Sequence, residues 1–413
     1  MTAATDRRPL RIGFIGSGFI AHFHLKALVG VRHVEVIGVF SPTPAKRAAF
    51  VQAVAELGLG DCVAHASLAA LLADERLDAV WILSPNHTRL ATMEAIAAVV
   101  RAGRSRVAAV ACEKPLARTL GEARRMLALV EEAGLLHGYL ENQLFSTAVV
   151  RGKEIIWRRA VPNSGRPYLA RAAEEHSGPH EPWFWRGDQQ GGGVLLDMMC
   201  HSVEVGRFLL TAPGAARQSL TLKSANATTA MLKWTQPKYA AALRARMGAE
   251  VDYSRRPAED FARGILTFAD ENGQELMVEA TTSWAYVGPG LRIVIELLGP
   301  EYAMEFSTLN TGLKVFMSRE VTGAQGEDLV EKQNAEQGLM PVLEDEAGVY
   351  GYTDANRHMV EAFRAGCAPM ETFADGVAVV EMLMALYKSA ETGQVIDVAA
   401  ADLDAYVPAV ARS

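Results

Sequence analysis

The chain has 413 residues, of which 22% are charged, and its net charge is −7. This length allows two domains, or one large domain with an ample core. The mildly acidic balance argues against nucleic acid or a membrane surface as a partner. No apolar run approaches the roughly 18 residues of a membrane span. The four cysteines form no Cys-x-x-Cys pair, so we expect reduced thiols in a cytoplasmic protein and neither a disulfide framework nor a metal site.

The most informative stretch lies near the start of the chain. The apolar residues 12–15 run into Gly16-Ser17-Gly18, and Ala21 follows three residues later. This is the Gly-x-Gly-x-x-Ala form of the dinucleotide fingerprint, in which the first glycine permits a tight turn and the second lets a pyrophosphate approach a helix N-terminus. The motif alone is unspecific, but an apolar segment precedes it and a second one follows at 34–40. Together they predict a dinucleotide-binding unit.

Strands and helices alternate over roughly the first third of the chain. We expect helices at 21–29, 44–56, 68–72, 90–102 and 120–133, and strands at 12–15, 34–40, 78–83, 107–112 and 136–140. Such alternation is typical of a doubly wound parallel sheet with helices on both faces. We therefore assign residues 1–141 to a dinucleotide-binding α/β domain.

The pattern changes after Glu141. Strands expected at 265–268, 275–282 and 291–298 have no helices between them, and a helical tail covers about 353–389. This favours an α+β domain over 142–413 with an open, mostly antiparallel sheet.

Two polar segments follow predicted strands, Ser84-Pro85-Asn86-His87 and Glu113-Lys114-Pro115. The carboxyl ends of parallel strands face the ligand crevice of a doubly wound sheet. Either segment alone would be read as a surface turn. Together with the glycine fingerprint they predict a site.

A second glycine run begins at Gly191 and precedes an apolar helical segment that carries Asp197 and His201. Three consecutive glycines would let the backbone approach a ligand. Residues four apart share one face of a helix. An isolated pair of this kind is usually structural, but an unpaired acid on an apolar helix would be costly.

These motifs together resemble the Gfo/Idh/MocA family of glucose–fructose oxidoreductases and inositol dehydrogenases. The matching pieces are Gly16-x-Gly18-x-x-Ala21, Pro85-Asn86, Glu113-Lys114-Pro115, Gly191-Gly192-Gly193, Asp197-x-x-x-His201 and Tyr387-Lys388-Ser389-Ala390-x-Thr392-Gly393. The resemblance implies an N-terminal Rossmann domain, a C-terminal sheet domain, a nicotinamide cofactor and a sugar or polyol substrate. It also implies a homo-oligomer, a dimer or tetramer, formed through the C-terminal sheet.

By position, the resemblance makes Lys114, Asp197 and His201 the catalytic group. An imidazole titrates near neutrality and suits the base that takes the proton of a secondary alcohol. The Lys114 ammonium could hydrogen-bond the same oxygen and favour the developing alkoxide. Asp197 would orient His201 or bond a neighbouring hydroxyl. Which of the three residues takes the proton stays open.

The resemblance also implies a set of cofactor-binding residues. They are Gly16, Gly18, Phe19, Ile20, Ser41, Thr43, Lys46, Pro85, Asn86, His87, Glu113, Lys114 and Asn142. His22 and His24 are expected to pack at the helix start and to take no part in catalysis.

The choice between NAD and NADP rests on the residues after the second strand. No acid stands where an NAD-specific site often places one, although Ser41 and Thr43 could bond a free ribose. Lys46 and Arg47 could instead meet a 2′-phosphate, or form a solvated helix face. We expect NAD, with NADP still open.

An aromatic and histidine-rich loop precedes the second glycine run. Its tryptophans could present flat faces to a sugar ring while its histidines bond hydroxyls, and nearby arginines, Arg166 and Arg186 among them, leave room for an anionic sugar. The alternatives are an aromatic cluster that caps the core, and arginines that are surface charges. The candidate substrate-binding residues are His176, His180, Trp183, Trp185 and Arg171.

Three functions share these motifs. The first is oxidation of a ring hydroxyl, at C3, of a sugar or glycoside. The second, implied by glycosidases within the same family, is a redox-neutral hydrolysis that oxidises C3, eliminates the aglycone, adds water and re-reduces the ring, with anionic glycosides such as sulfoquinovosides as candidates. The third is a non-catalytic NAD(P)-sensing regulator, which would have no use for proton-transfer groups.

Overall fold

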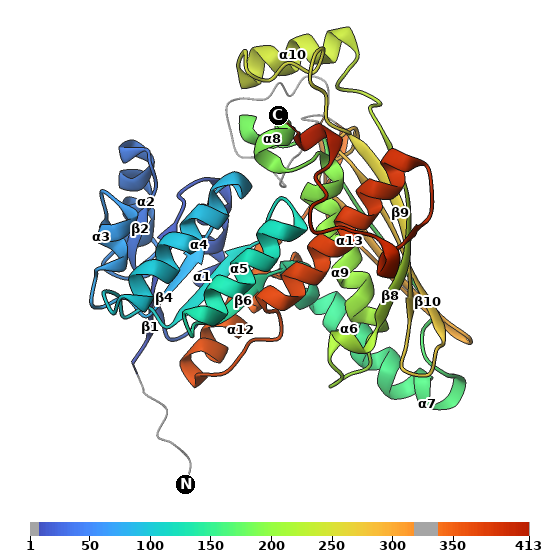
Figure 1. Cartoon of the computed structure of the whole chain (residues 1–413), viewed down its shortest axis with the longest axis horizontal. Coiled ribbons are helices and arrows are strands. Elements are labelled where there is room, and N and C mark those ends of the chain that lie inside the picture. The colour runs from blue at the N-terminus through green and yellow to red at the C-terminus, as the bar shows by residue number, and fades with distance from the viewer. Residues whose placement is uncertain (1–7, 318–337, 413) are drawn as a thin grey trace. The chain divides into compact units, whose positions relative to one another are not determined.

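The computed structural model describes residues 8–317 and 338–412 (Figure 1). The chain divides into two compact units. The first unit comprises Met1–Phe145 and Tyr350–Ala378, and the second comprises Ser146–Val349 and Val379–Ser413. The sequence predicted one boundary, after residue 141. In the structure a late segment, Tyr350–Ala378, also belongs to the first unit.

The first unit contains a parallel sheet. In the described part of the chain its six strands have the order β3-β2-β1-β4-β5-β6, which is the Rossmann order. The predicted doubly wound sheet is confirmed. The element bounds are β1 Leu10–Ile15, α1 Phe19–Leu28, β2 Val34–Phe40, α2 Pro44–Glu56, β3 Val63–Ala64, α3 Leu68–Leu72, β4 Ala79–Ile82, α4 Asn86–Arg101, β5 Ala109–Glu113, α5 Leu120–Glu132, β6 Leu136–Leu140, η1 Asn142–Phe145 and α12 Tyr352–Ala365.

Helix α12 belongs to the core of this unit. Its residues Met359, Val360 and Phe363 are buried in the same apolar cluster as the central strands. The ring of Phe363 meets that of Trp81 edge-on at 5.8 Å. A Cβ at Gly138 would lie 2.4 Å from the Met359 sulfur, so β6 and α12 pack closely. This burial explains why the segment joins the first unit.

The second unit contains a mixed sheet. Seven strands in the described residues have the order β12-β11-β7-β10-β9-β8-β15, and β7 and β10 are parallel while the other neighbours are antiparallel. The mostly antiparallel sheet expected from the sequence is confirmed. Its strand bounds, with the separate β13–β14 pair, are β7 Leu169–Glu175, β8 Thr221–Ala230, β9 Phe261–Ala269, β10 Glu275–Ser283, β11 Arg292–Gly299, β12 Tyr302–Ser307, β13 Leu313–Met317, β14 Gly338–Val342 and β15 Ile396–Asp397.

Helix α9 lies against this sheet (Figure 1). All 17 of its residues are buried, and it packs on β7 and β10. This burial on every side places α9 in the core of the second unit, together with its polar side chains Asp197, His201, Glu204 and Arg207. The other helices are α6 Thr147–Ile155, η2 Ile156–Ala160, α7 Val161–Ser164, η3 Pro182–Trp185, α8 Gly187–Gln190, η4 Arg217–Ser219, α10 Pro237–Met247, α11 Glu346–Val349, α13 Phe373–Thr392, η5 Val398–Ala400 and η6 Ala409–Ala411.

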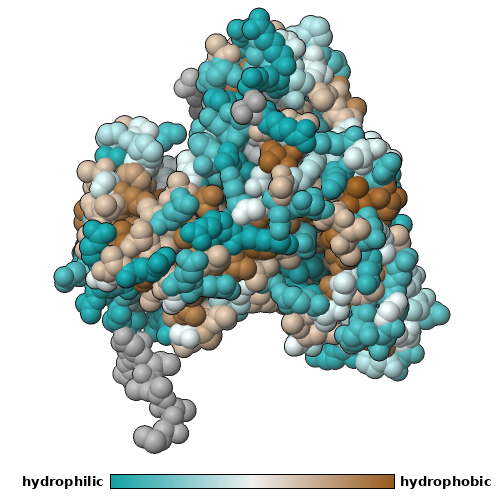
Figure 2. All heavy atoms as spheres, viewed as in Figure 1, coloured by the Kyte–Doolittle hydropathy of each residue, from teal (hydrophilic) through white to brown (hydrophobic). Residues whose placement is uncertain are grey.

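The tail predicted as one helical segment forms two helices, α12 and α13. Over the residues that the structure describes, no helix has the length and apolar character needed to cross a bilayer. The face visible in Figure 2 is mostly hydrophilic, with small separate apolar areas.

Candidate active site

The turn after β1 has the geometry that the fingerprint predicts. Gly16 has φ +115°, and a Cβ there would lie 2.7 Å from the carbonyl oxygen of Leu83. The Gly16 N–H donates to the Phe40 carbonyl at 2.8 Å. Only glycine fits this position, because the turn is held closely between the ends of β2 and β4.

The N-terminus of α1 is open. Gly18 is its N-cap, and within the described residues no side chain caps the helix and no heavy atom lies within 4 Å of a Cβ built there. The Ser17 hydroxyl is buried without a hydrogen-bond partner in the described part of the chain. Uncapped N–H groups and an unused hydroxyl beside an open glycine suit a pyrophosphate, so these residues fit a dinucleotide. Phe19 is half exposed at the helix start.

The loops after β4 and β5 are tied together by Arg89, which sequence reasoning missed. Arg89 is buried, and its guanidinium donates to the Ser84 carbonyl at 3.0 Å, to the Glu113 carbonyl at 2.7 Å and to the Pro115 carbonyl. The signal in the sequence is an arginine on the first turn of the helix that follows Pro85. That helix begins at Asn86, where the sequence suggested a turn as far as His87.

Glu113 faces the interior of the first unit. Its carboxylate accepts from His24 Nε2 at 2.8 Å and from the Lys114 N–H at 2.8 Å. Burial raises the pKa of this carboxyl, but the hydrogen bond from His24 and the nearby positive charges outweigh it and hold the pKa below its usual value. These contacts give Glu113 a positioning role for the Lys114 turn, and its expected contact with a cofactor stays a prediction.

His24 is buried and also contacts Asn356 of α12 through Nδ1 at 3.2 Å. It packs at the helix start, as expected. Lys114 is half-buried directly after β5, at the same edge of the sheet as the glycine turn.

The residues after β2 also lie at this edge. Ser41 is buried, whereas Thr43 and Lys46 are exposed. The Arg47 guanidinium donates to the carbonyl of Ser41 and, at 3.4 Å, to that of Pro42. Arg47 is thus folded back onto the loop.

Asn142, after β6, donates through Nδ2 to the Tyr350 carbonyl at 2.7 Å. Its Oδ1 is buried and has no partner among the described residues. An unused buried acceptor at this edge of the sheet also fits a cofactor.

The second glycine run is filled by the protein's own side chains. The Gly193 N–H donates to Glu259 Oε1 and to the Tyr387 hydroxyl oxygen, both at 2.9 Å, and the Tyr387 hydroxyl donates to Glu259 at 2.5 Å. A Cβ at Gly192 would lie 2.0 Å from the Tyr387 hydroxyl. The expected approach of a ligand to these glycines is therefore corrected: they make room for Glu259 and Tyr387. Burial raises the pKa of both groups.

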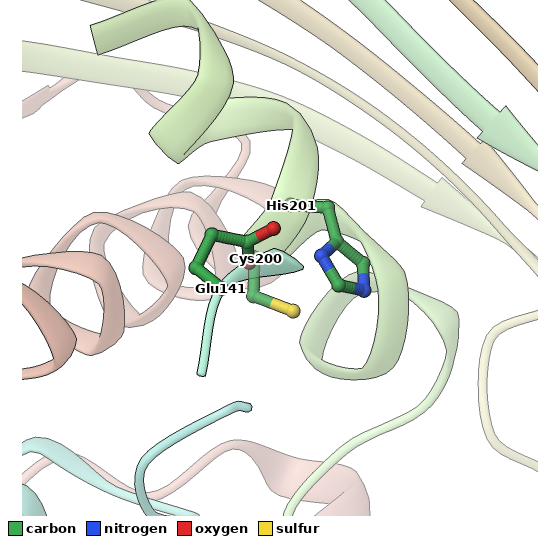
Figure 3. A group of neighbouring side chains, drawn as sticks. All are labelled: Glu141, Cys200 and His201. Carbon is green, nitrogen blue, oxygen red and sulfur yellow. The ribbon is translucent and has the colours of Figure 1, made fainter. Parts of the chain in front are cut away.

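Asp197 and His201 are buried one turn apart on α9. The Trp284 indole N–H donates to Asp197 Oδ2 at 3.2 Å, and the Cys200 thiol donates to the Asp197 carbonyl at 3.2 Å. Figure 3 shows Cys200 and His201 on adjacent positions of this helix, with Glu141 of the first unit also labelled. Trp284 follows β10, and sequence reasoning missed it because nothing along the chain links it to Asp197.

Trp185 lies in an aromatic core and not at a surface. Its side chain is 1% exposed, and its ring lies 5.1 Å from Trp234, 5.3 Å from Tyr253 and 5.1 Å from Trp284. Its indole N–H donates to the Pro179 carbonyl at 3.0 Å. This burial among other aromatic rings does not support the expected sugar platform at Trp185. Trp185 belongs to the cluster that the sequence left as the alternative.

His176 is also buried, and its Nδ1 accepts from the Gly178 N–H at 2.9 Å. Arg171 lies on β7 and pairs with Glu279 at 3.2 Å and Glu296 at 3.8 Å. These contacts use polar atoms of both residues within the loop and the sheet, and the expected contact of each residue with a substrate stays a prediction. His180 is exposed, and Trp183 is half-buried against Phe184 with ring centroids 3.7 Å apart.

The structure thus gathers two sets of predicted residues, each within one unit. The glycine turn, Ser41, Pro85 and Lys114 lie at one edge of the parallel sheet. Asp197 and His201 share one face of α9. The four cysteines form no disulfide with one another in the described part of the chain.

Comparisons with known proteins agree with this architecture. The 1,5-anhydro-D-fructose reductase of Ensifer adhaerens is 32% identical to this chain over 204 residues. The aligned region covers 48% of this chain and 56% of that protein. The D-glucoside 3-dehydrogenase of Escherichia coli K12 is 27% identical over 95% of this chain and 99% of its own length. The crystal structure of GenD2 from gentamicin A biosynthesis, in complex with NAD, superposes with a TM-score of 0.74 at 24% identity, covering 96% of this chain and 97% of that one.

Two family models match the chain. Residues 10–139 match the model described as an oxidoreductase family with an NAD-binding Rossmann fold. Residues 163–299 match the GFO/IDH/MocA C-terminal domain. These two matches together span more than half of the chain, which therefore belongs to the GFO/IDH/MocA family of oxidoreductases and has that family's NAD-binding Rossmann domain.

Proposed function

We propose that this chain is an NAD-dependent dehydrogenase that oxidises a secondary ring hydroxyl, at C3, of a sugar or glycoside. Family membership supports the oxidoreductase class. The alignment with a D-glucoside 3-dehydrogenase over nearly the full length of both chains supports the substrate class and the position. The observation that carries the proposal is the pair Asp197 and His201, buried one turn apart on α9, in a chain whose glycine turn is open for a dinucleotide.

The first unit supplies the cofactor site. The uncapped N-terminus of α1 and the Ser17 hydroxyl would hold the pyrophosphate, and the Asn142 amide oxygen would be available to accept a hydrogen bond from the cofactor. A bound NAD would supply the acceptor for the hydride that leaves the carbon bearing the reacting hydroxyl.

Side chains of the protein remove the proton of the reacting hydroxyl. His201 takes the hydroxyl proton, since an imidazole is the side chain best suited to a base near neutral pH. Asp197, fixed by the Trp284 indole N–H, orients His201 or binds an adjacent hydroxyl. Lys114 donates a hydrogen bond to the reacting oxygen and stabilises its developing negative charge. Lys114 is grouped with Asp197 and His201 on the basis of the family resemblance.

The redox-neutral glycosidase is the competing outcome. That route needs a second base to remove the C2 proton, for which the sequence offered His176 and His180, and a ring platform, for which it offered Trp183 and Trp185. His176 Nδ1 accepts a hydrogen bond within its own loop and Trp185 is packed among other aromatic rings, so His180 and Trp183 are the better candidates. The plain dehydrogenase is therefore the function that we favour.

A single incubation distinguishes the two routes. Methyl and aryl glucosides, with glucuronides as the anionic members, are incubated with NAD in deuterated water. We expect NADH to accumulate in proportion to a 3-keto glycoside whose glycosidic bond is intact. Released aglycone, deuterium at C2 and no lasting NADH would establish the glycosidase instead. No reaction with any sugar or polyol would remove the proposal.

The catalytic assignment has its own test. We expect Lys114→Met and His201→Asn each to lower turnover by about a hundredfold or more, because acid–base groups typically contribute about 10²–10⁴. NAD binding should persist in His201→Asn. His33→Asn is the matched control, because His33 is exposed and has a positive φ that asparagine also adopts. Near-normal turnover in both active-site variants would contradict the assignment.

The dimer or tetramer formed through the sheet of the second unit, and the cytoplasmic location, stay predictions. Light scattering during size-exclusion chromatography tests the first, and localisation of a tagged chain tests the second.

A further inference from the structure

The second unit contains a cavity of about 550 Å³ that the proposed function does not use. Three segments form its walls: the turn from η3 into α8, the loop that follows α10, and the late helix η6. The walls fit closely, because a Cβ at Gly187 would lie 2.1 Å from the carbonyl oxygen of Val410. Trp185 forms part of the lining where the cavity meets the aromatic core.

The lining of this cavity is unusually rich in arginine. It carries five guanidinium groups and three carboxylates, and therefore an excess of positive charge. The arginines are Arg186, Arg244, Arg255, Arg256 and Arg412, and the acids are Asp188, Glu250 and Asp252. The chain as a whole has the opposite sign, with a net charge of −7. The positive lining is thus a local feature.

The carboxylates do not neutralise all of these arginines. Asp252 is shared by Arg244 at 3.4 Å and Arg255 at 3.8 Å. The Arg256 guanidinium has no hydrogen bond or ion pair with any residue that the structure describes, and the Arg255 side chain is 85% exposed. Two adjacent arginines are therefore available to an incoming anion.

The remaining two arginines have partners of their own. Arg186 pairs with Asp188 at 2.9 Å, and Arg412 pairs at 3.6 Å with Glu391, which lies outside the lining. Both still face the same cavity. They add positive potential around the adjacent pair.

We propose that this cavity binds a small molecule that carries a phosphate ester, such as a phosphorylated sugar. Guanidinium groups match phosphate oxygens in paired hydrogen bonds. A phosphate ester has a charge of about −1.5 to −2 near neutral pH. A phosphate ligand therefore balances the charge of several arginines better than a ligand with a single carboxylate. Cavities that hold organic ligands measure about 300–1,000 Å³, so this one has room for a sugar attached to the phosphate.

The site has a physical link to the helix of the proposed catalytic pair. Trp185, in the cavity wall, packs on Trp284 at 5.1 Å, and Trp284 donates to Asp197 at 3.2 Å. A ligand in the cavity would therefore touch the packing that holds Asp197. The binding claim itself does not depend on the dehydrogenase proposal, because it requires neither NAD nor turnover.

Titration calorimetry on the full-length chain tests the claim with four probes: glucose 6-phosphate, inorganic phosphate, glucuronate and glucose. We expect glucose 6-phosphate to bind most tightly, inorganic phosphate at least several-fold more weakly, and glucose not to bind in this cavity. Equal affinity for glucuronate and glucose 6-phosphate would overturn the assignment to phosphate. Equal affinity for inorganic phosphate would overturn the assignment to a larger molecule.

Variants place the binding in the cavity. The double substitution Arg255→Gln/Arg256→Gln should weaken glucose 6-phosphate binding at least tenfold, and these exposed side chains are not needed for folding. Arg151→Gln is the matched control, since Arg151 is an exposed arginine of α6 that pairs only with Glu154 in the described residues. Binding that survives the double substitution, or that falls equally in the control, contradicts the proposal. So does the absence of binding by every phosphate probe.

Discussion

Two glycine turns in this chain look alike in sequence and differ in structure. Each precedes a helix, and each was expected to admit a ligand. At Gly18 the N-terminus of α1 is open, with no described atom within 4 Å of a Cβ position. At Gly193 the N-terminus of α9 is occupied by the Glu259 carboxylate and the Tyr387 hydroxyl.

A run of glycines therefore indicates that some group packs closely against the backbone. It does not show whether that group is a ligand or a side chain of the protein itself. In the first unit no side chain of the described residues caps the helix, and we propose that the approaching group is the cofactor. In the second unit the protein supplies its own anion, which satisfies the same kind of N–H group inside a buried helix. The two turns should therefore respond in opposite ways to an added methyl group.

The largest effect is expected at the closed turn. Gly192→Ala places a methyl group against the buried Tyr387 hydroxyl and breaks its hydrogen bonds, so we expect the second unit to lose about 3 kcal/mol of stability. Tryptophan fluorescence during urea unfolding measures this, because five of the six tryptophans lie in the second unit. Unchanged stability would mean that Tyr387 does not fill the space beside Gly192.

At the open turn, an added methyl group should weaken cofactor binding and leave stability unchanged. Gly18→Ala meets no neighbouring atom, so the unfolding curve should match that of the natural chain. The methyl group occupies the path of the pyrophosphate, and the lost hydrogen bonds to a charged group should weaken NAD binding about tenfold or more. Titration of nicotinamide fluorescence measures the affinity. An unaltered NAD affinity in a folded variant would place the cofactor elsewhere.

The other end of α9 supplies a smaller, pH-dependent effect. Lys153 donates to the Phe208 carbonyl at 2.6 Å, and burial, followed by the charge of Arg217, lowers the pKa of its ammonium from 10.5 to about 7. Between these pH values the unfolded chain binds more protons than the folded chain, so stability should rise with pH from about 7 toward 10.5.

Lys153→Met should remove this rise, which we expect to be roughly 1 kcal/mol per pH unit. Urea unfolding at pH 7, 8 and 9 measures the slope, with Lys223→Met, on the exposed part of β8, as the control. A slope that is the same in Lys153→Met and the natural chain would show that Lys153 stays charged when buried.

The smallest effect concerns the loop after β2. Arg47 is folded onto the Ser41 and Pro42 carbonyls, whereas Lys46 is exposed, and its contact with a cofactor stays a prediction. We expect Lys46→Ala to change NAD affinity by less than about twofold, as is usual for an exposed charge. NAD should bind at least as tightly as NADP. A clear NADP preference that Lys46→Ala abolishes would reverse this expectation.

Much of the first unit could be predicted from the sequence, because its signals are local. Each of the five strands predicted from the sequence is a short apolar run, and the residue after each predicted run is glycine, serine or glutamate. The strands at 34–40 and 136–140 and the helix at 44–56 have the predicted bounds. Lys114 and Asp197 could be picked out as candidates because each interrupts an apolar segment.

The partners of these residues could not be predicted, since they come from distant parts of the chain. Glu259 and Tyr387 reach Gly193 across 66 and 194 residues, and Trp284 reaches Asp197 across 87. The amino-acid composition of a loop does not show whether its tryptophans face a sugar ligand or are buried in a core. Trp185 is buried in the core. Helix α12 joins the first unit for the same reason, because only its packing shows which core its apolar face enters.

The central claim is that this chain removes a hydride from C3 of a glycoside and delivers it to NAD. The most direct measurement uses methyl glucoside labelled with deuterium at C3, with mass spectrometry of the reduced nicotinamide and of the sugar product. We predict one deuterium in the nicotinamide, an unlabelled 3-keto product, and loss of both in His201→Asn. Unlabelled NADH, or a product oxidised at another carbon, would contradict the account.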